Sequence, residues 1–188
     1  GDIIFHAYDQ DSREVEKVGH FHTHRQSCRA VRWQPTQGDW IMTGSADGTV
    51  SQNDRSGQQM WQSSKMDAGV STVEIVNDTG LTVAGSDEGQ IIGFDPRLKG
   101  QKSAVVKFPD EDRQEDYITQ LLIEKDGKSL LSTCGDATLA CYDLRFNKHK
   151  LKAMSDSQEN ELLSMCVVKE GKKLLTGDQN GVVGIPFH

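Results

Sequence analysis

Three histidines and a nearby cysteine are the first residues in the sequence that suggest chemistry. His20, His22 and His24 alternate, so an extended chain places them on one face. Imidazole nitrogens and thiolates are ligands of zinc, and Cys28 follows four residues later, so a zinc site is one interpretation. Loop histidines, with one of them structural, explain the same spacing without a metal. We favour this second interpretation and expect neither a metal nor a cofactor.

Two matched motifs suggest binding rather than catalysis. Phe94-Asp95-Pro96-Arg97 and Tyr142-Asp143-Leu144-Arg145 share the form aromatic-Asp-x-Arg. A guanidinium that projects from a turn can enter an acidic or carbonyl-lined pocket of a partner. Arg97 and Arg145, with Asp95 and Asp143, are therefore candidate protein-binding residues. In the alternative interpretation, each aspartate caps its turn and each arginine stays solvated.

Other motifs of catalysis are missing from the sequence. It has no glycine-rich phosphate loop before a helix, and no GxSxG, HExxH or CxxC motif. We expect no enzyme, no catalytic residue and no small-molecule substrate. The formal charge of −7 argues against direct nucleic-acid binding, and no apolar run is long enough to cross a membrane. The acidic run 109–116 is a solvated loop or a surface for a basic partner.

One short stretch, residues 43–50, recurs along the chain and organises it. Its copies are residues 84–91, 132–139 and 176–183, and their anchor residues Asp47, Glu88, Asp136 and Asn180 lie 41, 48 and 44 residues apart. Small residues end one strand, an acidic or amide residue makes a turn, and an aliphatic or β-branched residue starts the next strand. Asp-Gly and Asn-Gly favour a type I′ hairpin turn, with positive φ at both central residues. The spacing is typical of a four-stranded repeat unit.

Short strands separated by regular turns predict an all-β fold. We divide residues 1–188, as one propeller segment, into a partial unit 1–17, full units 18–62, 63–108 and 109–154, and a partial unit 155–188. Three full units, with two strands before them and three after, cannot close a ring. We therefore expect a longer chain or further segments.

These units resemble WD repeats, the blades of β-propellers. The resemblance implies that residues 1–188 make about four blades of an expected seven, and seven blades need on the order of 300 residues. In the first full unit, His24, Ser45 and Asp47 match the family's structural tetrad, while Asn53-Asp54 stands where Trp-Asp is usual. The resemblance implies that His24 bridges a strand hydroxyl and the turn carboxylate. The same slot holds Met66, Gln114 and Glu159 in the later units, so we expect the tetrad only in the first.

A narrower resemblance, to the group of WD repeat-containing protein 55, rests on residues 27–31, 83–97, 115–118 and 171–173. It implies a nuclear and nucleolar protein-interaction scaffold in ribosomal RNA processing and large-subunit assembly, with pre-ribosomal factors as partners. The aromatic-Asp-x-Arg motifs are similar to the WDxR motifs that dock onto the adaptor of cullin-4 ubiquitin ligases. The alternative function is therefore a substrate receptor of such a ligase.

Overall fold

The protein is described by a computed structural model that covers residues 1–34, 39–145, 160–168 and 173–184. In these ranges the regular structure is β-strand, apart from two short 3-10 helices. None of the described helices is long and apolar enough to cross a membrane. The predicted all-β fold is confirmed.

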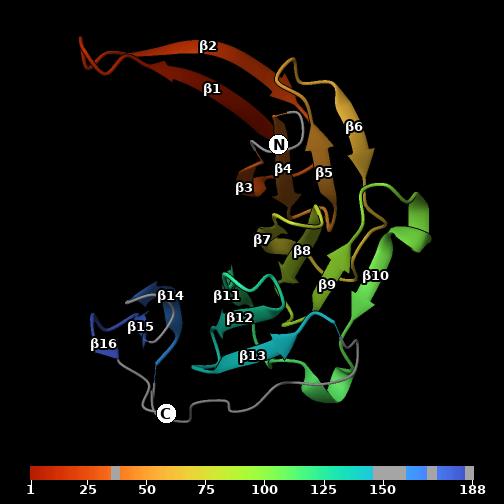
Figure 1. Cartoon of the computed structure of the whole chain (residues 1–188), viewed down its shortest axis with the longest axis vertical. Coiled ribbons are helices and arrows are strands. Elements are labelled where there is room, and N and C mark those ends of the chain that lie inside the picture. The colour runs from red at the N-terminus through yellow and green to blue at the C-terminus, as the bar shows by residue number, and fades with distance from the viewer. Residues whose placement is uncertain (35–38, 146–159, 169–172, 185–188) are drawn as a thin grey trace.

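The strands form antiparallel sheets that follow one another around an arc (Figure 1). The first sheet is a projecting hairpin of β1 (Asp2–Tyr8) and β2 (Val15–His22). The second holds β3 (Cys28–Gln34), β4 (Trp40–Ser45), β5 (Val50–Asn53) and β6 (Gln59–Gln62). The third holds β7 (Val70–Val76), β8 (Leu81–Ser86), β9 (Ile91–Phe94) and β10 (Ala104–Lys107).

Two further sheets complete the described arc. One holds β11 (Ile118–Ile123), β12 (Ser129–Cys134) and β13 (Leu139–Asp143). The other holds β14 (Leu162–Val168), β15 (Lys173–Asp178) and β16 (Val183–Gly184). The repeat pattern also predicts a strand at 150–154 and a strand end at Pro186-Phe187. These residues and Glu159 lie outside the described residues.

The same irregularity occurs in the first strand of each of the four sheets that follow the β1–β2 hairpin. These four sheets therefore repeat one structural unit. The pairing register shifts between Cys28 and Ala30, and also at Val70/Thr72, Ile118/Gln120 and Leu162/Ser164. An extra residue of this kind is a β-bulge, which bends a strand and increases its twist. This register also fixes which residues in the four sheets are equivalent.

The hairpin turns differ from the predicted type I′ geometry. In the first copy, the N–H of Gly48 donates to the Ser45 carbonyl at 3.0 Å, and the N–H of Ser45 donates to Thr49 at 3.1 Å. Only Gly48 has positive φ, at 84°, and Ala137 takes the same conformation in its copy, at 66°. This is a type I turn followed by a left-handed residue, a three-residue loop that needs a single positive φ.

The hydrophobic core is divided among the interfaces between consecutive sheets. One cluster joins β4 and β5 to β7–β9, with Met42, Val50, Val70, Val73 and Phe94 among its members. A second joins β8 and β9 to β11–β13, and a third joins β12 and β13 to β14. Each buried aliphatic side chain contributes roughly 1.5–3 kcal/mol to the free energy of folding. Because these side chains lie between sheets, each sheet is stabilised mainly by packing against its neighbours.

Candidate interaction corners and the polar networks behind them

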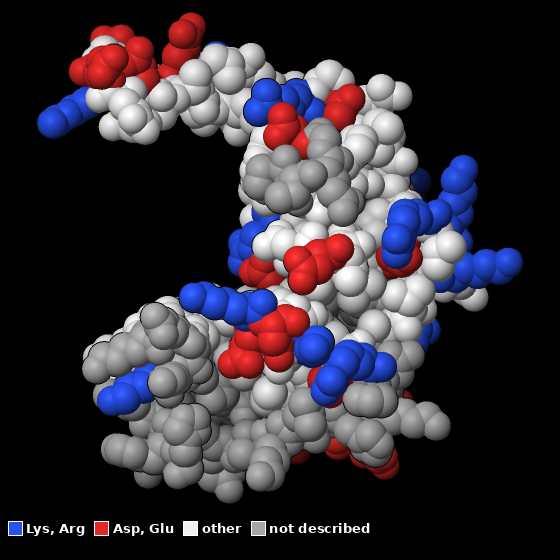
Figure 2. All heavy atoms as spheres, viewed as in Figure 1, with Lys and Arg blue, Asp and Glu red and all other residues white. Residues whose placement is uncertain are grey.

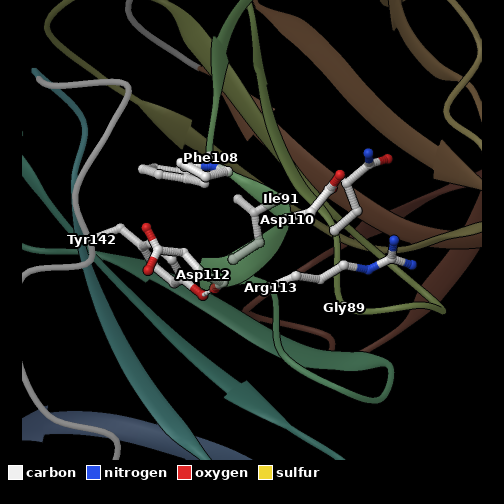
Figure 3. A pocket seen from close by; sticks show the side chains of 9 residues that line it. Gly89, Ile91, Phe108, Asp110, Asp112, Arg113 and Tyr142 are labelled. Carbon is white, nitrogen blue, oxygen red and sulfur yellow. Dashed lines mark hydrogen bonds between the residues drawn. The ribbon is translucent and has the colours of Figure 1, made fainter.

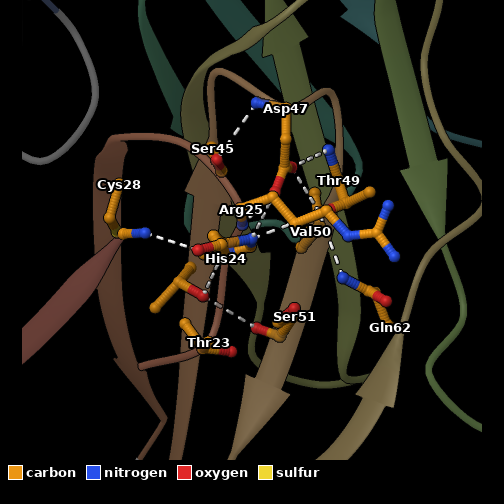
Figure 4. Close-up of polar contacts among 12 residues, drawn as sticks. Thr23, His24, Arg25, Cys28, Ser45, Asp47, Thr49, Val50, Ser51 and Gln62 are labelled. Carbon is orange, nitrogen blue, oxygen red and sulfur yellow. Dashed lines mark hydrogen bonds and ion pairs between the residues drawn. The ribbon is translucent and has the colours of Figure 1, made fainter. Parts of the chain in front are cut away.

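His24 lies at the centre of a buried network in the β3–β6 sheet (Figure 4). The residue is only 2% exposed. Its Nε2 lies 2.7 Å from the Thr43 hydroxyl, and its Nδ1 lies 3.2 Å from the Thr49 hydroxyl and 3.6 Å from an Asp47 oxygen. Thr49 in turn donates to Asp47 at 2.6 Å. The network therefore links the segment before β3 to strand β4 and to the turn that follows β4.

These contacts assign a neutral imidazole to His24. Since the Thr49 hydroxyl donates to Asp47, it accepts from Nδ1–H. The Thr43 hydroxyl lies 2.7 Å from Nε2 and 3.4 Å from the Ser51 carbonyl, and we assign its proton to the shorter contact, so that Nε2 accepts. Burial lowers the pKa of His24, and the Asp47 carboxylate opposes that effect only in part. Burial acts to raise the pKa of Asp47, but hydrogen bonds from Thr49 and the Arg25 N–H outweigh it, so this pKa is lowered.

Ser45 has a different part in the network from the one expected. The hydroxyl that meets His24 belongs to Thr43, and the Ser45 hydroxyl accepts the Asp47 N–H at 3.1 Å. Thr43 and Ser45 share a face of β4 because they are two residues apart. Ser45 lies at the strand end, within its own turn, so its hydroxyl reaches the turn backbone instead.

Gln114 builds an equivalent network in the β11–β13 sheet, where none was expected. Its side chain is 1% exposed and donates to the Thr138 hydroxyl at 2.6 Å. Its carbonyl oxygen accepts from the Ser132 hydroxyl. Thr138 donates to Asp136 at 2.5 Å, as Thr49 does to Asp47.

The chemical reason for this equivalence is that a neutral imidazole and a primary amide both offer one donor and one acceptor. In each sheet the donor meets a threonine that bonds the turn aspartate, and the acceptor meets a strand hydroxyl. The residue after the slot also donates its N–H to the aspartate, over 2.9 Å from Arg25 and 2.7 Å from Glu115. The prediction that such a network occurs only in the first full unit therefore does not describe the β11–β13 sheet.

The β7–β10 sheet, which lies between these two, has no equivalent network at the positions of His24 and Thr43. Met66 is 2% exposed and belongs to the same hydrophobic cluster as Ala84, which takes the position of Thr43. Here an apolar pair replaces both a polar bridge and its hydroxyl partner. No buried donor is left behind at these two positions, which explains why the replacement is tolerated.

The first aromatic-Asp-x-Arg motif forms a fixed corner after β9. Arg97 donates to Asp95 through Nε at 2.8 Å and through a terminal nitrogen at 2.7 Å, and its side chain is 76% exposed. The indole N–H of Trp61 donates to the Leu98 carbonyl at 2.7 Å, which ties the corner to β6. Hydrogen bonding to Arg97 lowers the pKa of Asp95.

The second motif repeats this geometry after β13. Arg145 donates to Asp143 through Nε at 2.9 Å and through a terminal nitrogen at 2.5 Å. This pairing lowers the pKa of Asp143 to about 2. The Arg145 side chain is 54% exposed while that of Asp143 is buried. Each aspartate therefore fixes its turn, as one interpretation held, and each arginine also remains accessible, as the other requires.

The acidic run before β11 is folded against the sheets (Figure 3). The Phe108 and Tyr142 rings lie 4.5 Å apart, and the Tyr142 hydroxyl donates to the Asp112 carbonyl at 3.1 Å. Arg113 donates to the Glu88 carbonyl and pairs with the Glu88 carboxylate at 2.9 Å. Figure 2 shows acidic and basic side chains interspersed over most of one face, with a group of acidic residues at the tip of the β1–β2 hairpin.

The histidines separate into different environments. His22 and His20 lie on the exposed hairpin, where their ring nitrogens are 2.7 and 3.6 Å from one Asp2 oxygen, whereas His24 is buried. Cys28 directs its thiol to the Ala30 carbonyl at 3.5 Å. Within the described ranges no group of three or more such residues has metal-binding geometry.

Comparisons with known proteins place the sequence. The family model described as nucleolar protein 10-like, N-terminal domain, a β-propeller, matches residues 10–183. WD repeat-containing protein 55 of Arabidopsis thaliana is 35% identical over 187 residues, covering 97% of this chain and 49% of the relative. The human protein of that name is 25% identical over 184 residues, covering 97% and 46%. WD repeat-containing protein JIP5 of Laccaria bicolor is 37% identical over 105 residues, covering 56% and 24%.

Two of the solved structures that match are computationally designed proteins. Ika4 superposes with a TM-score of 0.72 at 18% identity, over 88% of this chain and 93% of that one. Ika8 gives 0.73 at 17% identity, over 91% and 49%. At these identities the likeness shows the fold alone. The chain spans about half the length of the WD repeat-containing protein 55 relatives.

Proposed function

We propose a function from the premise that the chain belongs to the nucleolar protein 10-like, N-terminal domain family of β-propellers. WD-repeat propellers generally act as non-catalytic scaffolds that mediate protein–protein contacts. We infer that this chain is such a scaffold, located in the nucleus and nucleolus, and that it acts in ribosomal RNA processing and large-subunit assembly. Its partners are then pre-ribosomal proteins.

The observation that carries this proposal is the family match over residues 10–183, whose description names a nucleolar protein. The polar networks are consistent with a scaffold, because their aspartates are occupied by backbone and threonine donors. They hold turns in place and leave binding to the rims and corners of the sheets. The division of the chain into repeat units that begin at residues 18, 63, 109 and 155 is part of the same proposal.

Sedimentation of nuclear extract through a density gradient tests this function. A tagged form of the protein is expected to migrate with large-subunit precursor particles and to leave those fractions after ribonuclease treatment. A protein that stays in the light fractions, with unchanged levels of ribosomal RNA precursors after its depletion, contradicts the proposal.

A second candidate function rests on the two matched corners. Arg97 and Arg145 lie at equivalent positions in consecutive sheets, each exposed and each held by the aspartate two residues before it. We propose, as the alternative, that they dock the protein onto the adaptor of a cullin-4 ubiquitin ligase as a substrate receptor. Two preoriented guanidinium groups suit a protein partner, since little side-chain freedom is left to lose on binding.

Co-purification with that adaptor separates the two candidates. Arg97→Ala combined with Arg145→Ala is expected to abolish adaptor recovery and to leave gradient sedimentation unchanged. The matched control is Arg55→Ala, which removes a 69% exposed arginine from the corresponding corner after β5. Equal recovery of the adaptor with all three proteins rejects docking through this pair.

A further inference from the structure

The connection between β9 and β10 carries a cluster of positive charge. It holds Arg97, Lys99 and Lys102 against one acidic residue, Asp95, in a chain whose formal charge is −7. All three cations are exposed, whereas the Asp95 side chain is 15% exposed and pairs with Arg97. Among the described residues, neither lysine forms an ion pair. Figure 2 shows basic side chains gathered on this side of the molecule, where the short helix η2 (Gly100–Ser103) leads into β10.

An exposed apolar side chain lies among these cations. Leu98 stands between Arg97 and Lys99 in the sequence and is 39% exposed. Residues 97–102 are all exposed, and Leu98 is the one large apolar residue among them. A single exposed leucine is ordinary on a protein surface, so its meaning here comes from the charges on both sides of it. A partner that complements this corner needs acidic groups together with an apolar one.

Hydrogen bonds hold the corner in one conformation. The Leu98 N–H donates to the Asp95 carbonyl at 3.0 Å, and the indole N–H of Trp61, on the neighbouring sheet, donates to the Leu98 carbonyl at 2.7 Å. Farther along, the Ser103 hydroxyl donates to the Gly100 carbonyl at 2.6 Å, and the Asp95 N–H donates to the Ser103 carbonyl at 2.8 Å. A segment that is fixed in this way loses little conformational entropy when a partner binds.

The corresponding connection between β5 and β6 lacks these features. It has five residues, 54–58, against nine in 95–103, and Arg55 is its one cation. Arg55 pairs with Asp39 at 3.2 Å and lies 5.1 Å from the centroid of the Trp33 ring. The longer connection after β9 therefore adds two unpaired lysines and an exposed leucine, at a place where the earlier sheet has one arginine that is already engaged.

We propose that the corner formed by Arg97, Leu98, Lys99 and Lys102 is a docking site for an acidic segment of a protein partner that also carries an aliphatic side chain. Carboxylates of that segment pair with the two lysines, and its aliphatic group covers Leu98. Arg97 uses Nε and one terminal nitrogen on Asp95, which leaves the other terminal nitrogen for a further carboxylate. The site needs only this corner, and it goes beyond both functions proposed above.

The observations favour a protein segment over a nucleic acid. Proteins that bind single-stranded nucleic acid combine a positively charged groove with aromatic side chains on which the bases stack. Residues 95–103 contain no aromatic residue, and a phosphate backbone offers no apolar group to Leu98. The formal charge of −7 also repels a polyanion that extends beyond the corner, whereas a short acidic segment contacts the corner alone.

Fluorescence anisotropy with a labelled peptide of repeated Glu-Leu-Asp units tests the proposal. Lys99→Glu combined with Lys102→Glu should weaken peptide binding by about tenfold or more, because attraction becomes repulsion. Leu98→Ser should weaken it by about threefold, because an apolar contact is lost. The matched control is Lys65→Glu combined with Lys125→Glu, which makes the same change of charge at two other exposed lysines and should leave the affinity within about twofold of the wild type.

Absence of peptide binding by the wild type, or equal weakening by the corner and control variants, overturns the proposal. A single-stranded oligouridylate of equal charge is the second probe. If it binds as tightly as the peptide and loses that binding in Lys99→Glu with Lys102→Glu, the corner is a nucleic-acid site and the assignment to a protein segment is wrong. Arg145→Ala, which removes an arginine that adaptor docking requires, should leave peptide binding unchanged. Weaker peptide binding in that variant contradicts a site confined to one corner.

Discussion

The β3–β6 and β11–β13 sheets solve one problem with different side chains. Each must hold a turn aspartate, Asp47 or Asp136, against the segment that enters the sheet. One uses the imidazole of His24 and the other the amide of Gln114, and both pass through a threonine two residues after the aspartate. What is shared is a donor and an acceptor at a fixed place, and not a residue type.

The sheet between them shows the limit of that rule. Met66 and Ala84 stand at the positions of the bridging residue and of its hydroxyl partner, and they interact through apolar packing alone. A bridge is thus required only where a hydroxyl and an aspartate are present to be satisfied. The following predictions test this comparison.

Removing a bridge is expected to have the largest effect. His24→Leu and Gln114→Leu should each lower the free energy of unfolding by about 1–3 kcal/mol, because buried hydroxyl groups lose a partner. Met66→Leu keeps an apolar group of similar volume and should cost less than about 1.5 kcal/mol. Urea denaturation of the three variants measures the difference. Equal losses at all three positions would contradict the comparison.

Acidification is expected to distinguish the two bridges. Burial lowers the pKa of His24 below its usual 6.5, so the unfolded chain binds more protons than the folded chain below that pH. The stability from neutral His24 is present above pH 6.5 and is lost as the pH falls towards the folded pKa.

The variant His24→Gln places the non-titrating group of the other sheet in this position. As the pH falls from about 7.5 to about 5.5, the melting temperature of this variant should rise relative to that of the wild type. Gln114→His should show the reverse trend. Parallel pH profiles for the wild type and His24→Gln would argue against a buried, neutral His24.

A smaller effect is expected at Ser45, which supports the turn and not the bridge. Ser45→Ala removes one acceptor of the Asp47 N–H and should cost about 0.5–1.5 kcal/mol. The control is Ser12→Ala, where an exposed hydroxyl accepts the Glu14 N–H at 3.3 Å, with a change within about 0.5 kcal/mol. Denaturant midpoints compare them, and a loss at Ser45 larger than that of His24→Leu would contradict this order of effects.

The smallest effect on folding is expected at the two corners. Arg97→Ala removes a 76% exposed side chain and should leave the melting temperature unchanged, whereas Arg145→Ala also takes a partner from the buried Asp143 carboxylate and should lower it slightly. Differential scanning calorimetry checks this. A large drop in melting temperature would make these arginines structural and would confound any loss of partner binding.

Much of the fold could be predicted from the sequence because its signals are local. The spacing of the turn residues predicted the order of the strands, and β8 and β12 end at Ser86 and Cys134, among the small residues that were expected to end these strands. The turn type was not predictable from Asp-Gly alone, since that pair suits both type I′ and a type I turn with a left-handed third residue. Which of these two turns forms depends on the register of the paired strands, and that register is set by the whole sheet.

The bridge at Gln114 was missed because the family pattern was applied by residue type. Its signal is nevertheless in the sequence: Gln114 precedes Asp136 by 22 residues and His24 precedes Asp47 by 23. Thr138 and Ser132 repeat Thr49 and Thr43 around those aspartates. Met66 has the same spacing, but Gln90 and Ala84 stand at those two places. Asking which donors and acceptors could meet would have separated the three sheets.

Site-resolved amide hydrogen exchange tests the equivalence of the two networks most directly. The N–H groups of Thr49 and Thr138 donate to Asp47 and Asp136 and should both be protected in the wild type. In Gln114→Leu, protection at Thr138 and Glu115 should fall while Thr49 and Arg25 stay protected, and His24→Leu should do the opposite. Unchanged protection at Thr138 in Gln114→Leu would contradict the claim that Gln114 holds its turn as His24 holds the other.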